Sequence, residues 1–500
     1  MNRTLLGIGL AALTAFMMLQ PSGALAQFDP ATGVPGVRPP TPKAPTPTLS
    51  RIPVVKPKVT VKVNLNRPIN QADVQTTPED LLENIEPIEP LEPVVPAVRT
   101  ASAPVKEVVE KIVTGIPLPP ARPALTFGRP VLFEAPRVPN MITLLINGDV
   151  EPIGSEYGLE IVERTELAMF DAQLVKLRAG ADEDVADIVK QLIADGRVLG
   201  AQPDYLFELQ QATTEQLPAS ALASLQYAPK KMGVDTAHNL TRGENTKIAV
   251  IDTGIDGTHS VFSKARLNAF DAIGTPSAAP EPHGTAIAGL IAANQDMLGI
   301  APGADVLIVR AFSQDADGKF TSDSYVIAKA IDWAVAQGAQ VINMSFAGPG
   351  DPLILKMMDL LSERDVLVVA AAGNSGAGAP AAYPAAHPHA IAVTATDVSD
   401  ALYANANRGS YVTIAAPGVD VIAPAPDNGY EMVSGTSIAT AHMSGILALM
   451  LSESADLKRN DVVDLLQRTA EDKGAPGLDP EFGLGLVNAF RATTALKDAG

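Results

Sequence analysis

Short apolar runs alternate with helical stretches throughout the second half of this chain. The runs are continuous rather than alternating with polar residues, and valine and isoleucine dominate them, at residues 248–251, 306–309, 341–344, 366–370 and 391–393. Continuous apolar runs are typical of strands that are covered on both faces. Segments with helical character, at 322–337 and 352–363, separate several of them. The alternation predicts an α/β fold with a doubly wound, mainly parallel sheet, whose ligand sites would lie at the carboxyl ends of the strands.

The composition agrees with this fold. The chain has 500 residues, of which 46% are hydrophobic and only 4% aromatic. Small aliphatic residues therefore supply most of the apolar content, as in helices packed closely on a parallel sheet. A chain of this length is expected to divide into two or three segments.

The first 26 residues resemble a secretory signal peptide. A basic start at Arg3 precedes an apolar run of about 15 residues, and Ala24-Leu25-Ala26 then offers a small-residue cleavage pattern. The run is too short to span a bilayer comfortably, and no second run long enough follows it. We therefore expect a secreted or periplasmic protein with no transmembrane span in the mature chain.

Residues 27–140 contain more than half of the 42 prolines of the chain. Proline at this density removes backbone donors and opposes regular helix or sheet, so a disordered, polyproline-like segment is predicted. It could serve as a spacer or docking tail, or simply as a solvated linker, which such a composition favours.

Residues 141–210 have the pattern of a small α+β domain. Strands are predicted at 141–146, 161–170, 172–177 and 198–209, with a helix at 182–194 capped by Asp182. With a weaker helix at 151–159, the order fits a ferredoxin-like layout. The following segment, 210–225, is polar and rich in small residues, which indicates an exposed linker and a site of proteolysis.

Charge and cysteine content exclude several classes of function. The formal net charge of −19 argues against a nucleic-acid partner, because tracking phosphates requires clustered Lys and Arg. The chain contains no cysteine, so disulfides, thiolate zinc sites and cysteine nucleophiles are excluded.

Four polar residues stand at the edges of apolar elements. Asp252 and Asn374 each follow a predicted strand, and His283 and Ser437 each stand at the start of a small-residue helix. Taken singly, each has an ordinary structural explanation as a turn former, packed histidine or helix cap. Free N–H groups at a helix start also favour developing negative charge, so Ser437 can equally be a nucleophile.

Together these residues identify a family resemblance over residues 225–500. The motifs Asp252-Thr253-Gly254, His283-Gly284-Thr285 and Ser434-Gly435-Thr436-Ser437 resemble the Asp, His and Ser motifs of subtilisin-like serine proteases, in the same order. Residues 371–374 resemble the segment that carries the oxyanion asparagine, and residues 341–345 the strand that pairs with substrate.

The resemblance implies a secreted serine endopeptidase that acts through an acyl-enzyme intermediate. Ser437 would be the nucleophile, His283 its base, Asp252 the group that orients the imidazole, and Asn374 the oxyanion donor. It also implies a substrate-binding wall, for which medium apolar residues at the cleaved position are expected, formed by Ser345, Phe346, Ala347, Gly348, Ala372, Gly373 and Ala382. His442, in the serine motif, is interpreted as a packed structural residue.

The resemblance further implies that the domain at 141–210 is a self-processing propeptide that inhibits the enzyme. The expected partners are protein or peptide substrates and this propeptide, and the enzyme is expected to be a monomer. No cofactor is required; calcium is possible, but the loop after the histidine helix is short and no spacing forms a recognisable site.

Two alternatives remain open from the sequence. The first is a catalytically silent scaffold on a protease fold, which the intact Asp252, His283, Asn374 and Ser437 oppose. The second is an esterase or acyl transferase that uses the same nucleophile, which a propeptide and an extended substrate strand disfavour.

Overall fold

The computed structural model describes residues 131–210, 213–217, 226–275 and 281–497. The predicted signal peptide and almost all of the Pro-rich segment lie outside these residues. Within them, two layered parts are distinguished below as the α+β unit, residues 131–210, and the parallel-sheet unit, residues 226–497.

The α+β unit has the predicted βαββαβ order. Its elements are β1 (Arg137–Ile146), α1 (Glu151–Glu156), β2 (Glu160–Leu167), β3 (Ala172–Arg178), α2 (Val185–Ala194) and β4 (Val198–Leu209). The strands pair antiparallel in the order β2-β3-β1-β4, so the ferredoxin-like layout is confirmed. Helix α2 begins later than predicted: Asp184, not Asp182, caps it by accepting a hydrogen bond from the Ala186 N–H.

The parallel-sheet unit contains seven parallel strands in the order β15-β14-β13-β11-β6-β8-β7. Five of them correspond to the predicted apolar runs: β6 (Lys247–Asp252), β8 (Asp305–Arg310), β11 (Val341–Met344), β13 (Leu367–Ala371) and β14 (Ala390–Thr396). The edge strands β7 (Arg266–Asp271) and β15 (Ile414–Pro417) were not predicted. Most residues of β7 are exposed and none is buried, which explains why it lacks a continuous apolar run.

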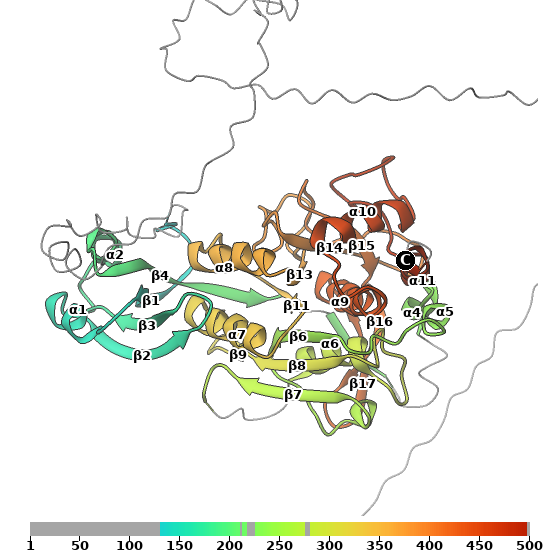
Figure 1. Ribbon diagram of the computed structural model, residues 1–500, viewed down its shortest axis with the longest axis horizontal. Coiled ribbons are helices and arrows are strands. Elements are labelled where there is room, and N and C mark those ends of the chain that lie inside the picture. Colours follow the sequence, from blue (N-terminus) through green and yellow to red (C-terminus); the bar gives the residue numbers. More distant parts are fainter. Residues whose placement is uncertain (1–130, 211–212, 218–225, 276–280, 498–500) are drawn as a thin grey trace, which may run out of the picture. The chain divides into compact units, whose positions relative to one another are not determined.

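Helices cover both faces of this sheet (Figure 1). One face packs against α6 (Pro282–Ala292) and α9 (Thr436–Glu453), and the other against α7 (Ser324–Ala336) and α8 (Pro352–Glu363). The doubly wound fold is therefore confirmed. The remaining helices of the described part are α4 (Tyr227–Lys231), α5 (Val234–Ala237), η1 (Ser260–Phe262), α10 (Arg459–Thr469) and α11 (Ala489–Lys497).

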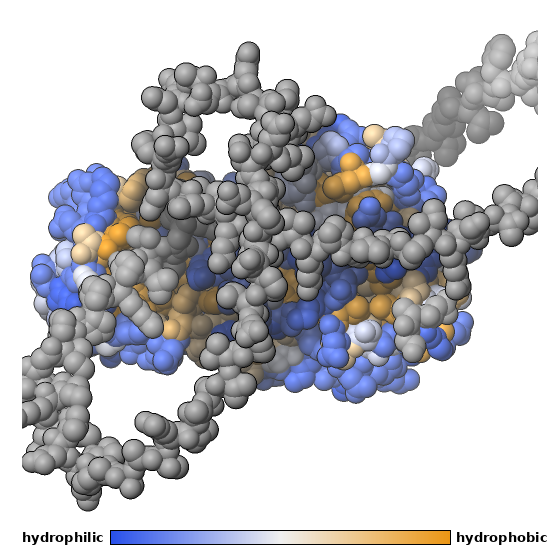
Figure 2. All heavy atoms as spheres, turned by 45° about the horizontal axis from the view of Figure 1, so that its top comes forward, coloured by the Kyte–Doolittle hydropathy of each residue, from blue (hydrophilic) through white to orange (hydrophobic). Residues whose placement is uncertain are grey.

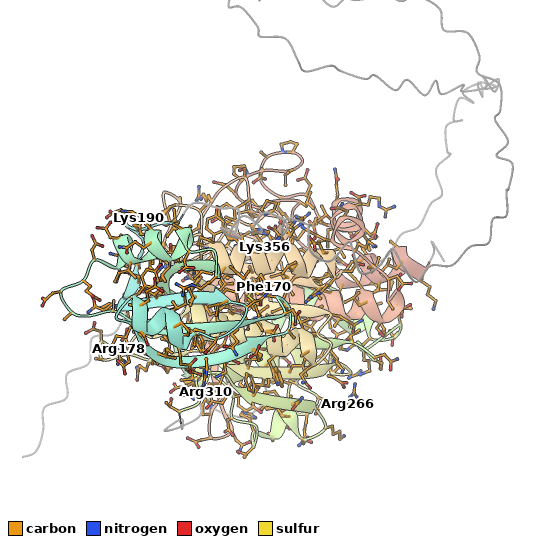
Figure 3. All side chains as sticks on the ribbon, turned by 60° about the vertical axis from the view of Figure 1, so that its left-hand side comes forward. Phe170, Arg178, Lys190, Arg266, Arg310 and Lys356 are labelled. Atoms are coloured by element: carbon orange, nitrogen blue, oxygen red, sulfur yellow. The ribbon has the colours of Figure 1, made fainter. Side chains whose placement is uncertain are left out.

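The α+β unit packs against α7 and α8. A single hydrophobic cluster combines Leu174 and Phe207 of the α+β unit with Ile331 and Leu353 of the two helices. Phe170, in the turn between β2 and β3, packs on the same cluster, whereas Arg178 and Lys190 lie at the outer surface of the unit (Figure 3). The two units are thus joined by an apolar contact.

Strand β4 extends beyond the α+β unit. Its last residues form a strand between β10 (Phe320–Asp323) and β12 (Phe346–Ala347), and β9 (Ser313–Gln314) pairs with the outer side of β10. Figure 1 shows β4 running from the α+β unit toward β11. The end of one unit is therefore built into the sheet structure of the other.

The predicted linker at 210–225 contains a strand. Residues Thr213–Leu217 form β5, which pairs antiparallel with β17 (Gly429–Ser434), and β17 pairs in turn with β16 (Val421–Ala425). The polar composition gave no indication of this strand, because its partner is more than 200 residues away in the sequence.

Exposed hydrophobic side chains are scattered over the described surface. Where grey atoms do not cover it, Figure 2 shows hydrophobic residues in separate patches among hydrophilic ones. None of the helices in the described ranges is both long and apolar enough to cross a membrane.

Candidate active site

Asp252 and His283 meet at the carboxyl edge of the sheet. Asp252 is the last residue of β6, and His283 is the second residue of α6. The His283 Nδ1 lies 2.9 Å from Oδ1 and 3.0 Å from Oδ2 of Asp252. The Asp252 side chain is only 1% exposed, and it also accepts a hydrogen bond from the Thr253 N–H. This carboxylate therefore fixes the orientation of the imidazole ring.

The environment of His283 favours its protonated form. Burial, the largest single effect, lowers the pKa of His283, but the Asp252 carboxylate, the Gln210 carbonyl and the Glu431 carboxylate together outweigh it and raise the pKa. Glu431 belongs to β17 and is 6% exposed. Burial in turn raises the pKa of Glu431, while His283 lowers it. The ring is thus poised to accept a proton.

Ser437 is the second residue of α9, which begins at Thr436 directly after Gly435. At this position its backbone N–H has no acceptor within the helix. Its hydroxyl donates a hydrogen bond of 3.0 Å to the carbonyl oxygen of Gln210, the residue that follows β4. The Nε2 of His283 is buried and has no hydrogen-bond partner within the described residues.

Asn374 follows β13 and lies against the start of α9. Its Oδ1 accepts hydrogen bonds from the N–H of Thr436 at 3.0 Å and from the Thr436 hydroxyl at 2.7 Å. These two bonds fix which way the amide faces, because its oxygen is already engaged. The Nδ2 of Asn374 is buried without a hydrogen-bond partner in the described part of the chain, so it is free to donate.

The end of β4 occupies the cleft beside these residues. Phe346 pairs with Leu209 and Ala347 with Glu208, while the facing strand β10 pairs with residues 206–208. The Gln210 N–H then donates to the Ser345 carbonyl at 3.2 Å. The side-chain Oε1 of Gln210 accepts a hydrogen bond of 2.8 Å from the Asn374 N–H. Gln210 is therefore held on both its backbone and its side chain.

An aromatic cluster lies along the same strand. The Phe207 ring meets the Phe346 ring edge-on, with ring centroids 5.9 Å apart, and the Phe312 ring also packs on Phe346, with a centroid distance of 5.1 Å. Gly348 leaves room for this arrangement, because a Cβ atom there would lie 2.3 Å from Cδ1 of Phe207. Ser345, Phe346, Ala347 and Gly348 thus all line the cleft that β4 fills.

The other three residues of the predicted wall lie behind the asparagine. The Gly373 N–H donates to the Thr436 hydroxyl at 3.2 Å, and the Ala372 carbonyl accepts from the Tyr411 hydroxyl at 2.8 Å. Ala382 is buried, and the Tyr383 that follows it exchanges backbone hydrogen bonds with Gly348. Ala382 is thus linked through Tyr383 to Gly348, and Gly373 through Thr436 to Asn374.

Sequence reasoning missed three residues of this region. Gln210 was placed at the start of a linker, and Phe207 and Glu431 were not singled out. The chain carries no local signal for them, since each depends on a partner from another element. His442 is packed as interpreted: it is fully buried, bonds the Pro417 carbonyl through Nδ1 at 2.8 Å, and burial lowers its pKa to about 4.

No group of three or more His, Asp or Glu residues suited to a metal ion occurs in the described ranges. The Ser437 hydroxyl contacts the Gln210 carbonyl oxygen, and Asp252 orients the His283 imidazole. Asn374, which binds the Gln210 side chain through its N–H, keeps an unpartnered amide donor in the described part of the chain. This is an arrangement suited to acyl transfer.

Comparison with known proteins agrees with this geometry. A family model described as the subtilase family matches residues 243–485. Thermitase from Thermoactinomyces vulgaris is 32% identical over 277 residues, covering 54% of this chain and 96% of thermitase. Subtilisin Savinase from Lederbergia lenta is 36% identical over 277 residues, which cover 54% of this chain and 99% of Savinase. A thermophilic serine proteinase from Bacillus sp. (strain AK1) is 31% identical over 319 residues, which cover 62% of this chain and 76% of that proteinase.

A similar fold is found in the crystal structure of fervidolysin from Fervidobacterium pennivorans, a keratinolytic enzyme related to subtilisin. The TM-score is 0.63 at 24% identity, over 72% of this chain and 62% of that one. Identity at this level shows the shared fold alone, whereas the curated relatives are similar enough to establish descent. The chain belongs to the subtilase family and is a serine peptidase of the subtilisin type.

Proposed function

We propose that this serine endopeptidase is made as a zymogen that cleaves its own chain between Gln210 and Gln211. The α+β unit would be the propeptide, and its last strand would occupy the cleft as a substrate does. The observation that carries the proposal is the hydrogen bond of 3.0 Å from the Ser437 hydroxyl to the Gln210 carbonyl. A nucleophile in contact with one particular peptide group marks that group as the first to react.

The reaction follows from the groups around this carbonyl. Ser437 Oγ attacks the Gln210 carbonyl carbon while the free Nε2 of His283 takes the hydroxyl proton. Asp252 holds the other ring nitrogen and stabilises the imidazolium that forms. The Nδ2 of Asn374 and the Ser437 N–H stabilise the negative charge on oxygen. His283 then protonates the Gln211 amine as the peptide bond breaks, and water releases Gln210 from the acyl-enzyme.

The same cleft would bind other substrates after the propeptide leaves. An extended polypeptide can form a strand between β10 and β12, as residues 206–209 do here. The sequence predicts medium apolar residues at the cleaved position. In this chain that position is held by Gln210, so the proposed preference is for medium-sized uncharged residues and includes a polar amide. An apolar side chain three residues earlier would take the place of Phe207.

The remaining parts of the chain complete this account. Residues 1–26 would direct export to the periplasm or the medium, and residues 27–130 would act as a spacer ahead of the propeptide. The mature enzyme would begin at Gln211 and act as a monomer. A silent scaffold is disfavoured by the contact of Asp252 with the His283 ring and by that of the Ser437 hydroxyl with the Gln210 carbonyl.

The intact masses of the exported wild type and Ser437→Ala protein test this proposal. Wild type should yield two products that separate after Gln210, whereas Ser437→Ala should remain joined through this bond with an unchanged circular-dichroism spectrum. Ser454→Ala, at the other end of α9, is the matched control and should be processed like wild type. Cleavage after Gln210 in purified Ser437→Ala would refute the assignment.

Labelling with a serine-reactive fluorophosphonate separates the remaining alternatives. Mature wild type should be labelled once, at Ser437, and heat-denatured protein should not be labelled. An absence of labelling in the processed protein would favour a silent scaffold. Cleavage of simple esters with no cleavage of a denatured protein would favour an esterase.

A further inference from the structure

The side chain of Gln210 makes a contact of its own, separate from that of its carbonyl group. Its Oε1 accepts a hydrogen bond of 2.8 Å from the backbone N–H of Asn374. Because a backbone N–H can donate but not accept, the group that faces it has to be an acceptor, and the amide oxygen of glutamine is one. The chain thus offers a fixed donor to the side chain that precedes the cleaved bond.

The Asn374 N–H lies between two N–H groups that are already engaged. The Gly373 N–H donates to the Thr436 hydroxyl at 3.2 Å, and the Ser375 N–H donates to Oδ1 of Asn407 at 2.8 Å. Asn407 is 2% exposed, and its own N–H donates to the Gly373 carbonyl at 2.9 Å. These bonds hold the backbone on both sides of Asn374, so the direction of its N–H is set before a substrate arrives.

Gly373 makes this arrangement possible. Its φ angle of 114° lies in the region that favours glycine. A Cβ atom at this position would also lie 2.4 Å from Nδ2 of Asn407. A glycine here therefore allows Asn407 to approach closely enough to bond the segment on either side of Asn374.

The side chain of Asn374 does not compete for this N–H. Its Oδ1 already accepts two hydrogen bonds from Thr436, one from the N–H and one from the hydroxyl. Among the described residues, the acceptor that faces the N–H is Oε1 of Gln210. An apolar side chain in its place would shield the N–H from water without bonding it, and such an unpaired donor weakens binding.

We propose that the backbone N–H of Asn374 is a specificity-determining group that recognises the side-chain oxygen of glutamine at the cleaved position. This inference rests on the proposed function and narrows its substrate class to proteins cleaved after glutamine. Lysine and arginine end in donors, which cannot pair with another donor. Asparagine is one methylene shorter, so its oxygen does not reach the same point.

The test uses the mature wild-type enzyme and four peptides with the sequence of residues 205–217, which differ only at position 210. This position holds glutamine, its apolar isostere homoleucine, asparagine, or leucine, which is the apolar isostere of asparagine. The kcat/KM ratio of glutamine to homoleucine should exceed the ratio of asparagine to leucine about tenfold. Comparing the two ratios cancels the general effect of an apolar pocket, because each pair exchanges an amide for the same branched alkyl group.

A fifth peptide shows which atom of the amide is recognised. It carries Nε2-methylglutamine, which keeps the oxygen and one N–H. Its kcat/KM should stay within about threefold of the glutamine value, since the oxygen makes the hydrogen bond. A loss of about tenfold would show that the NH₂ group is recognised instead, which would overturn the inference.

The outcomes separate this inference from the proposed function. If the two ratios are equal, the Asn374 N–H does not select the side chain, although cleavage of the peptides shows that the enzyme is a peptidase. If none of the peptides is cleaved after position 210, the proposed function itself fails, and the inference fails with it.

Discussion

The Ser437 hydroxyl donates a hydrogen bond of 3.0 Å to the carbonyl oxygen of Gln210, across 227 residues of sequence. The oxygen that accepts this bond is the one on which negative charge would develop during attack. The nearby amide of Asn374 has its oxygen occupied by Thr436 and its Nδ2 unpartnered within the described residues. These groups define which side chains should affect turnover and which should affect release of the propeptide.

Substitution of Asn374 by alanine should lower kcat by about 10²–10³ and change KM little. That range comes from removing the corresponding donor in subtilisin, a member of this family. The loss would fall on kcat because the donor acts on charge that is present only in the transition state. Steady-state kinetics of the mature enzyme measure it. Ser375→Ala is the control, since Ser375 bonds its neighbour Asn407 through the backbone N–H, and equal losses in both variants would contradict a specific role for Asn374.

Glu431→Gln should extend activity to lower pH. The Glu431 carboxylate is one of the groups that raise the pKa of His283. The base must be neutral to accept a proton, so a raised pKa of His283 moves the acidic limb of the pH–activity profile to higher pH. Removing the negative charge lowers the pKa and moves this limb downward. The pH dependence of kcat/KM measures the shift; Glu431→Asp should retain the wild-type limb, and an upward shift in Glu431→Gln would refute the prediction.

The cleaved propeptide should leave the enzyme faster as the pH rises from about 4 to about 7. Burial and the neighbouring Asp323 raise the pKa of Asp204 from 3.8 to about 7, although Lys176, 3.2 Å away, opposes them. After separation the carboxyl group meets water and titrates near its ordinary value. The complex therefore binds a proton more tightly than the separated parts, so it is most stable at acidic pH. It loses stability as the pH rises from 3.8 to about 7, because over this range the separated carboxyl group is ionised while Asp204 in the complex stays protonated.

Incubation of the processed complex at pH 5 and pH 8 checks this prediction, with aliquots assayed for peptidase activity at one common pH. Activity should appear faster at pH 8. Asp204→Asn keeps a polar side chain beside Thr143 and the Tyr325 N–H, its partners in the wild type, but has no proton to exchange. The release rate of the Asp204→Asn propeptide should therefore differ less between pH 5 and pH 8 than that of the wild type. Faster release of the wild-type propeptide at pH 5 would show that the sign is wrong.

Gly348→Ala should weaken the binding free energy of the cleaved propeptide by about 1–3 kcal/mol, the usual effect of overpacking. The new methyl group would lie 2.3 Å from the Phe207 ring, so the ring or the strand has to move. The release rate of the cleaved propeptide measures this change. Truncation of the ring removes the clash. Phe207→Ala should therefore reduce the binding free energy of the propeptide less in the Gly348→Ala protein than in the wild type. Additive effects of the two substitutions would show that they do not meet.

Much of the parallel-sheet unit could be predicted because its signals are local. A strand buried on both faces has to be apolar along its whole length, so β6, β8, β11, β13 and β14 each leave a continuous run in the sequence. The edge strand β7 has no buried residue, so it leaves no such run and was missed for that reason. The motifs around Asp252, His283, Asn374 and Ser437 were recognisable because together, and in this order, they resemble those of subtilisin-like serine proteases.

The fold class, the βαββαβ order of the α+β unit and the four residues proposed to carry the reaction could thus be inferred before the chain was seen folded. The folded chain was needed to reveal which peptide group faces Ser437, that Glu431 lies near His283, and that a polar segment pairs with β17. Backbone hydrogen bonds to an edge strand are made by groups common to every residue, so composition does not reveal them. A partner more than 200 residues away becomes visible only once the chain is folded.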